Sequence, residues 1–133
     1  MKEKEIDAIV SFYRIMAKLK EMKRRGWVLR DIPLGESVSD HTFGVALLTM
    51  LLAERYSLNV EDSLKMALIH EVGETEIGDI TPDDSMSADE KRRKEEKAAK
   101  EILNRVDPSG ELFELWKDFE YSRTPEGRLV KEI

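Results

Sequence analysis

The sequence has no cysteine among its 133 residues, which excludes disulfide bonds and thiolate metal ligands. Any bound metal ion must therefore be held by nitrogen and oxygen atoms. No apolar run approaches the roughly 20 residues that a membrane-spanning helix needs, and residues 1–10 lack the apolar core of a signal peptide. The net charge of −6 differs from the basic excess of proteins that bind nucleic acid polymers. We therefore expect a soluble, cytoplasmic protein whose ligand is neither a membrane nor a nucleic acid polymer.

Alternating strand patterns and internal repeats are also lacking, and the apolar residues follow the 3.6-residue period of helices. This period predicts helices over residues 5–24, 40–56, 59–74, 88–106 and 111–123, with a further helix beginning at 126–133. The length suits one domain with a single core. We therefore expect an all-α fold, an irregular bundle of about five to six helices.

The predicted helix 40–56 is apolar nearly all round from Val45 to Ala53, with Ser39 as a plausible N-cap. We expect this helix to be central and buried. The aromatic residues of helix 111–123 predict either core packing or a subunit interface. The charged run at 89–97 predicts a solvated helix face.

Only two histidines are present, His41 and His70, and each lies on a helix predicted to be buried. Such a histidine is either a hydrogen-bonded core residue or a ligand. The stretch ALIHEVGETEIGDI adds Glu71, Glu74 and Asp79 near His70, and burying these carboxylates without a cation would cost several kcal/mol each. On a continuous helix His70 and Glu74 share one face, with Glu71 about 100° away. A divalent cation closed in by His41 would satisfy this set.

The segment HEVGE matches the first two positions of the HExxH zinc-protease motif, but Glu74 stands in place of its second histidine, so that motif is rejected. The segments ESVSDHTFGVALLTMLLAE and ALIHEVGETEIGDITPDD resemble the two halves of the HD-domain metal-dependent phosphohydrolases, with their pattern H…HD…D. The segment LKEMKRRGWVLRDIPLGESVSDH resembles the R-x-G-W element of the 5′-deoxynucleotidase branch. The resemblance covers about residues 12–133 and implies one HD domain over residues 1–133.

The resemblance implies a hydrolase that removes the 5′-phosphate from deoxynucleoside monophosphates and works as a homodimer. It implies that His41, His70 and Glu71 are metal ligands, that Glu74 positions or activates the attacking water, and that Asp79 takes part in proton transfer to the leaving group. Two imidazoles with carboxylates suit Co²⁺, Mn²⁺, Zn²⁺ or Fe²⁺. The apolar residues of helix 111–121 could supply the dimer interface.

For the substrate, the resemblance implies that Arg24, or its neighbour Arg25, holds the phosphate, because a guanidinium can bind two oxygens at once. Trp27 matches an aromatic residue beside the sugar, where bulk against the 2′ position favours deoxyribose. An alternative role for Trp27 is simple packing.

Two features of the sequence depart from the family pattern. Glu71 stands where the family has aspartate, and the extra methylene should alter metal affinity or preference. The segment LVKEI ends at Ile133, one residue before the family's final aspartate ligand, so we expect the chain to lack the family's C-terminal helices. Two alternatives therefore remain: a degenerate HD domain that binds a nucleotide or protein partner without catalysis, and a plain helical protein with core histidines.

Overall fold

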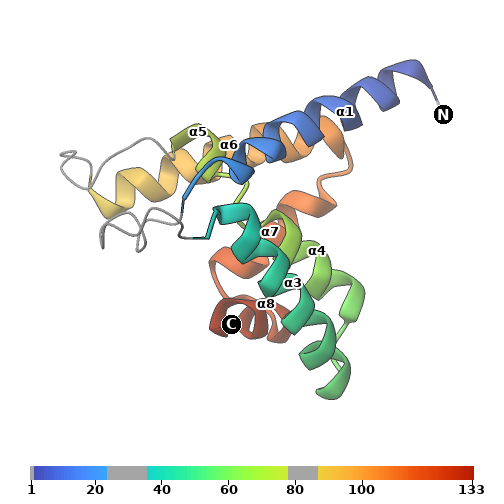
Figure 1. The fold of residues 1–133 in the computed structure, drawn as a ribbon, viewed down its shortest axis with the longest axis vertical. Helices are drawn as coiled ribbons and strands as arrows, with labels where there is room; N and C mark the ends of the chain where they lie inside the picture. Colours follow the sequence, from blue (N-terminus) through green and yellow to red (C-terminus); the bar gives the residue numbers. More distant parts are fainter. Residues whose placement is uncertain (1, 24–35, 78–86) are drawn as a thin grey trace.

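The computed structural model describes residues 2–23, 36–77 and 87–133 (Figure 1). Its elements, in chain order, are α1 (Glu3–Ala17), η1 (Lys18–Lys20), α3 (Val38–Arg55), α4 (Val60–Ile69), α5 (Glu74–Ile77), α6 (Ala88–Val106), α7 (Glu111–Glu120) and α8 (Pro125–Glu132). Within these ranges there is no strand, only an isolated bridge between Lys23 and Ser37. The prediction of an all-α fold is confirmed, since six of these helices have eight or more residues.

The helices form two packed groups (Figure 1). The helix α1 lies along α6, and its N-terminal turns project beyond the rest of the structure. The helices α3, α4, α7 and α8 pack on one another below them, and α7 also contacts α6 and so joins the two groups. This arrangement gives two connected clusters of buried side chains in place of one central layer.

The two clusters meet at the C-terminal half of α4. One contains Ile69, Val72, Ala99, Ile102, Leu103, Phe113 and Trp116, and the other contains Val45, Met66, Ala67 and Val130. Leu115 of α7 packs against both clusters. Burying an apolar side chain of this size contributes about 1.5–3 kcal/mol. The segment that carries His70 is therefore anchored on both sides by core packing.

The prediction of one continuous helix over 59–74 is wrong at its end. The helix α4 stops at Ile69, residues 70–73 form a turn, and Glu74 begins the short helix α5. Backbone hydrogen bonds of 3.0 Å from Val72 N to Ile69 O and from Glu74 N to Glu71 O close this turn. The apolar period did not reveal the break because Val72 stays buried beyond it.

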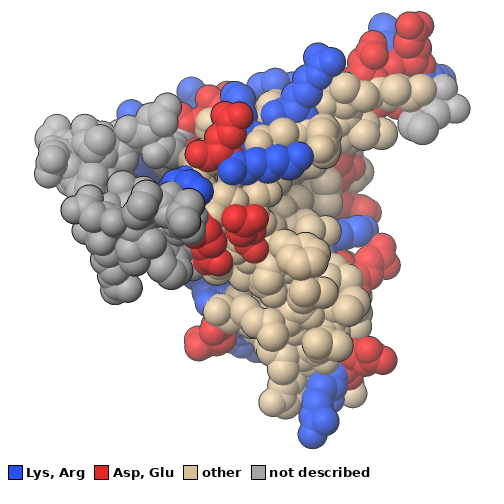
Figure 2. Space-filling view, viewed as in Figure 1, with Lys and Arg blue, Asp and Glu red and all other residues tan. Residues whose placement is uncertain are grey.

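The prediction that helix 40–56 is central and buried is also wrong. The helix α3 buries Val38, Thr42, Val45, Thr49 and Ala53. On its other sides it exposes Phe43, Leu47, Leu48, Met50 and Leu51. Among the described elements α3 packs mainly against η1, α4 and α8, and the large apolar side chains on its other sides are exposed. Figure 2 shows the resulting uncharged surface over α3.

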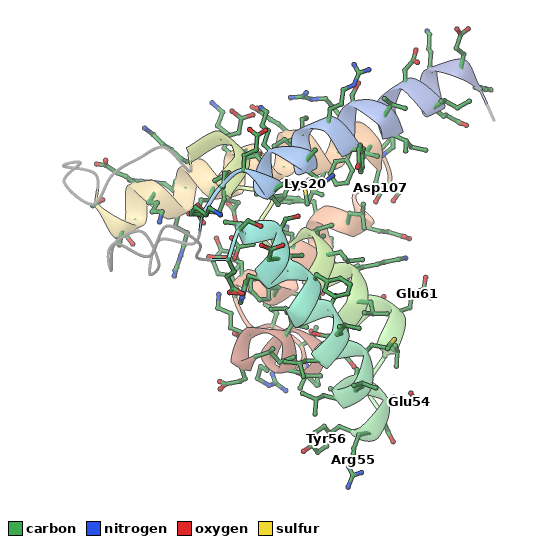
Figure 3. All side chains as sticks on the ribbon, in the orientation of Figure 1. Lys20, Glu54, Arg55, Tyr56, Glu61 and Asp107 are labelled. Atoms are coloured by element: carbon green, nitrogen blue, oxygen red, sulfur yellow. The ribbon has the colours of Figure 1, made fainter. Side chains whose placement is uncertain are left out.

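The corner between α6 and α7 is held by Asp107, which Figure 3 labels. Its carboxylate accepts hydrogen bonds from Ser109 Oγ at 2.6 Å and from Leu112 N at 2.9 Å. These bonds, led by that from the Ser109 hydroxyl, lower the pKa of Asp107. Because Phe113 and Trp116 follow within the next turns of α7, this corner directs both aromatic side chains into the core. Of the two roles predicted for these aromatics, core packing is confirmed for Trp116, which is only 1% exposed. The dimer interface on helix 111–121 stays a prediction.

Candidate metal centre

His41 is delivered by the first turn of α3, and the start of that turn is fixed by a capping box. The N-cap is Ser37, not the predicted Ser39: Asp40 N donates to Ser37 Oγ at 3.0 Å, and Ser37 N donates to the Asp40 carboxylate at 3.0 Å. The bond from the Ser37 backbone leads the lowering of the Asp40 pKa. His41 follows directly and is half-buried, with its Nδ1 3.8 Å from Glu36 Oε2. The capping box therefore fixes the start of α3 and with it the position of the His41 side chain.

His70 is the C-cap residue of α4, and one of its ring nitrogens is already engaged. Its Nδ1 lies 2.6 Å from the carbonyl oxygen of Ala67, so Nδ1–H donates and the neutral ring keeps its lone pair on Nε2. Nε2 lies 3.2 Å from Glu71 Oε1. Two electron-pair donors face each other there, an arrangement that requires a proton or a cation between them. A backbone carbonyl behind the ring is the usual way a metal-binding histidine is oriented.

Among the described residues, His41, His70 and Glu71 form a group that could hold a metal ion. Each offers one ligand atom, and the three atoms all lie within 4.8 Å of one another. The two imidazole rings lie edge to face, with centroids 6.1 Å apart and planes at 70°. Ligand atoms about 2.1 Å from one cation lie roughly 3–4 Å apart. A small movement of the three side chains toward one another would therefore bring their ligand atoms to this spacing. The donor set of two nitrogens and one oxygen fits a borderline divalent cation with open positions for water.

The glutamate at position 71 reaches this group despite its extra methylene. The Oε1 atom of Glu71 lies 3.2 Å from His70 Nε2, and the Glu71 side chain keeps 26% of its surface exposed. Glutamate at this position therefore places a carboxylate oxygen beside the His70 nitrogen.

An aromatic side chain that the sequence reading did not connect with the site lies against His70. The ring of Phe119 on α7 has its centroid 5.0 Å from that of His70, with the planes tilted by 57°. Lys131 Nζ lies 4.6 Å from the centroid of the Phe119 ring. The spacing of aromatics on helix 111–123 indicated burial but could not indicate which neighbour Phe119 would meet. Its apolar ring limits water on that side of the imidazole.

Glu74 follows Glu71 by three residues, at the first position of α5, and it acts on Glu95 of α6. Burial, followed by the charge of Glu74 and a hydrogen bond with it, raises the pKa of Glu95 to about 7. Lys91 Nζ, 3.8 Å from Glu95 Oε1, acts in the opposite direction. The charged pattern of residues 89–97 predicts a solvated helix face and does not indicate that Glu95 is largely buried. Sequence periodicity could not show that α5 covers this part of α6.

Four predicted site residues, Arg24, Arg25, Trp27 and Asp79, lie outside the described residues. Of the others, His41, His70 and Glu71 are brought together, and Glu74 lies on the adjoining helix. Glu76, in the same acidic stretch, is exposed.

The fold and this donor set define a helical domain with a candidate metal centre between two consecutive helices. The family model of the HD domain matches residues 16–133. The chain therefore belongs to the HD-domain family, whose members are metal-dependent. None of the described helices is long and apolar enough to cross a membrane.

Individual relatives agree with this assignment. The chain is 37% identical over 129 residues to 5′-deoxynucleotidase HDDC2 of Xenopus laevis, covering 95% of the chain and 63% of that protein. It is 36% identical over 128 residues to 5′-deoxynucleotidase HDDC2 of Homo sapiens, covering 95% and 62%. A predicted metal-dependent phosphohydrolase from Magnetospirillum magnetotacticum has a similar structure, with a TM-score of 0.75 and 28% identity over 96% of the chain and 65% of that protein. The chain thus spans less than two thirds of the length of these relatives.

Proposed function

We propose that the protein is a metal-dependent phosphohydrolase that removes the 5′-phosphate from deoxynucleoside monophosphates. The observation that carries this proposal is the convergence of His41, His70 and Glu71, whose ligand atoms lie within 4.8 Å of one another. The names of the relatives from Xenopus laevis and Homo sapiens supply the substrate class. Since Co²⁺, Mn²⁺, Zn²⁺ and Fe²⁺ all suit such a donor set, the proposal includes each of them.

In this proposal His41, His70 and Glu71 hold the divalent cation. When bound, such a cation lowers the pKa of a coordinated water towards about 7 and neutralises charge on phosphoryl oxygens. The surrounding residues orient these ligands. The Ala67 carbonyl fixes the His70 ring through Nδ1, and the ring of Phe119 packs against the same imidazole. Both contacts would leave Nε2 free to bind the cation.

Glu74 takes the proton from the attacking water in this scheme. The water oxygen forms a bond to phosphorus while the bond from phosphorus to the 5′ oxygen breaks, and Asp79 supplies a proton to that leaving oxygen. The products are a deoxynucleoside and inorganic phosphate. A carboxylate placed for such a transfer contributes typically about 10²- to 10⁴-fold in rate.

Substrate selection is assigned to the segment before α3. Arg24 or Arg25 holds the phosphate as a bidentate partner, and Trp27 packs beside the sugar so that a 2′-hydroxyl is disfavoured. This assignment is based on the sequence RRGW at residues 24–27, which resembles the R-x-G-W element of the 5′-deoxynucleotidase branch.

The proposal places the protein in the cytoplasm as a homodimer. The absence of cysteine suits a reducing compartment. Support for self-association comes from α3, where Phe43, Leu47 and Leu51 are 66%, 45% and 59% exposed. Exposed large apolar side chains gathered on one helix are typical of an interaction surface.

The test is release of inorganic phosphate from 5′-deoxynucleoside monophosphates by the purified protein supplied with Co²⁺ or Mn²⁺. We expect turnover with these substrates, at least tenfold less with the matching ribonucleotides, and none after treatment with a chelator. Absence of turnover with every divalent metal would refute the proposal. A Trp27→Ala variant that keeps the full preference for deoxyribose would remove Trp27 from it.

A further inference from the structure

We propose that Glu95 of α6 is a positioning residue that holds the carboxylate of Glu74 in the orientation needed to receive a proton from the attacking water. This inference rests on the proposed role of Glu74. It concerns a side chain on a helix whose charged sequence indicated only a solvated face.

The first observation is the close approach of α6 to the turn that precedes Glu74. A Cβ atom added to Gly73 would lie 3.2 Å from both Cβ and the carbonyl oxygen of Glu95, and 3.3 Å from its Cα. Such distances are tighter than ordinary van der Waals contact, so glycine is what allows the two backbones to meet here. The backbone of Glu95 is therefore placed directly against the residue before Glu74.

The second observation is that burial, the charge of Glu74 and a hydrogen bond with it together raise the pKa of Glu95. Such a bond requires one of the two carboxyl groups to carry a proton, and Glu95 is the donor because burial disfavours its charged form. Its side chain is only 18% exposed. One oxygen of Glu74 is thereby occupied as an acceptor, and the other remains available to take up a proton.

Charged side chains of α6 and α7 also act on Glu95. Lys91, one turn earlier on α6, lies 3.8 Å from the Glu95 carboxylate. Glu120 of α7 adds negative charge, but Arg92 and Lys131 each lie 3.8 Å from its own carboxylate. Of these groups, Glu74 is the one whose hydrogen bond contributes to raising the pKa of Glu95.

The third observation is the difference in support between the two helices. Glu74 begins a helix of four residues, Glu74–Ile77, which has too few turns to fix a side chain by itself. Glu95 belongs to a helix of 19 residues that is anchored in the core by Ala98, Ala99, Ile102 and Leu103. A catalytic carboxylate gains precision when a second residue on a rigid element holds it. The arrangement on α6 supplies that second residue.

The experiment compares Glu95→Ala, Glu95→Gln and the control Glu101→Ala, an exposed position on the same helix. We expect Glu95→Ala to lower kcat about tenfold to a hundredfold, with KM and metal stoichiometry unchanged. Glu95→Gln should restore kcat to within about threefold of the wild type, because its amide N–H can donate to Glu74 in place of the carboxyl proton. Glu101→Ala should behave as the wild type.

Two results would overturn the inference: wild-type kcat in Glu95→Ala, or an equal loss in Glu95→Gln and Glu95→Ala. Thermal melts by circular dichroism establish that each variant is folded, and rescue by glutamine separates positioning from a loss of packing. Glu74→Ala is measured in parallel. If Glu74→Ala is inactive while both Glu95 variants match the wild type, only the role of Glu95 fails. If Glu74→Ala is fully active, the proposed function of Glu74 fails, and the role of Glu95 with it.

Discussion

The imidazole rings of His41 and His70 lie edge to face with their centroids 6.1 Å apart, although each comes from a different helix. One ring is placed by the capped start of α3 and the other by the end of α4. The packing of α3 on α4 brings them together, with Val45, Met66 and Ala67 in one buried cluster. The candidate metal centre is therefore a product of tertiary packing, and neither helix forms it alone.

Replacing Glu71 with aspartate tests whether glutamate is a working ligand at that position. The Glu71→Asp change should alter metal affinity about tenfold, because it withdraws the carboxylate by roughly 1.5 Å where ligand distances tolerate about 0.2 Å. Phosphate release with saturating metal should stay within about tenfold of the wild type. Glu76→Asp makes the same change at an exposed position and should affect neither measurement. Activity that is found only in Glu71→Asp would instead identify the natural protein as a non-catalytic binder.

The sequence predicted the helical class and the two histidines because both depend on local pattern. Apolar residues at a 3.6-residue period define the helices, and His41 and His70 stand on consecutive ones. The break after Ile69 was hidden because Val72 continues the apolar stripe into the turn. Which side of α3 would be covered depends on the neighbouring elements, and that information is absent from the helix's own sequence.

Charged residues were harder to place than apolar ones. In the sequence Glu95 is one of several charged residues on a predicted solvated helix face, and only the packing of α5 on α6 distinguishes it from the others. Phe119 is similarly ambiguous, since the same aromatic signal fits core, interface or a contact with His70. The catalytic role of Glu74 stays a prediction because it concerns chemistry and not packing. The roles of Asp79, Arg24, Arg25 and Trp27 stay predictions because these residues lie outside the described ranges.

Gly127 and Gly44 offer a matched pair for stability. A Cβ on Gly127 would collide with the carbonyl oxygen of Asp118 and lie 2.8 Å from its carbon, so Gly127→Ala should displace α8 from α7. We expect a loss of at least about 2 kcal/mol in the free energy of unfolding. Gly44→Ala meets nothing within 4 Å in the interior of α3 and should gain about 0.5–1 kcal/mol.

Urea denaturation measures both values. Equal stability of the two alanine variants would contradict the described packing of α8, whose Val130 belongs to the cluster with Met66 and Ala67.

The raised pKa of Glu95 gives stability a pH dependence in the metal-free protein. The folded state keeps a proton on Glu95 up to about pH 7, whereas the unfolded chain releases it near its ordinary pKa of 4.5. Because the folded state binds more protons in this window, the contribution of Glu95 to stability falls as the pH rises from about 5 to about 7. Glutamine cannot ionise, so the melting temperature of Glu95→Gln should fall less than that of the wild type across that pH range.

Melting curves in the presence of a chelator make this comparison, with Glu101→Gln as the control on the exposed side of α6. Parallel pH profiles for Glu95→Gln and the wild type would show that Glu95 titrates normally in the folded chain.

The most direct test of the account is the amount of divalent metal that the protein retains. After loading with Co²⁺ or Mn²⁺ and removal of free ions, we expect about one equivalent per chain in the wild type. His70→Ala should retain far less, because it removes the nitrogen that faces Glu71 at 3.2 Å. Less than about a tenth of an equivalent in the wild type, or the same metal content in His70→Ala, would contradict a metal centre at His41, His70 and Glu71.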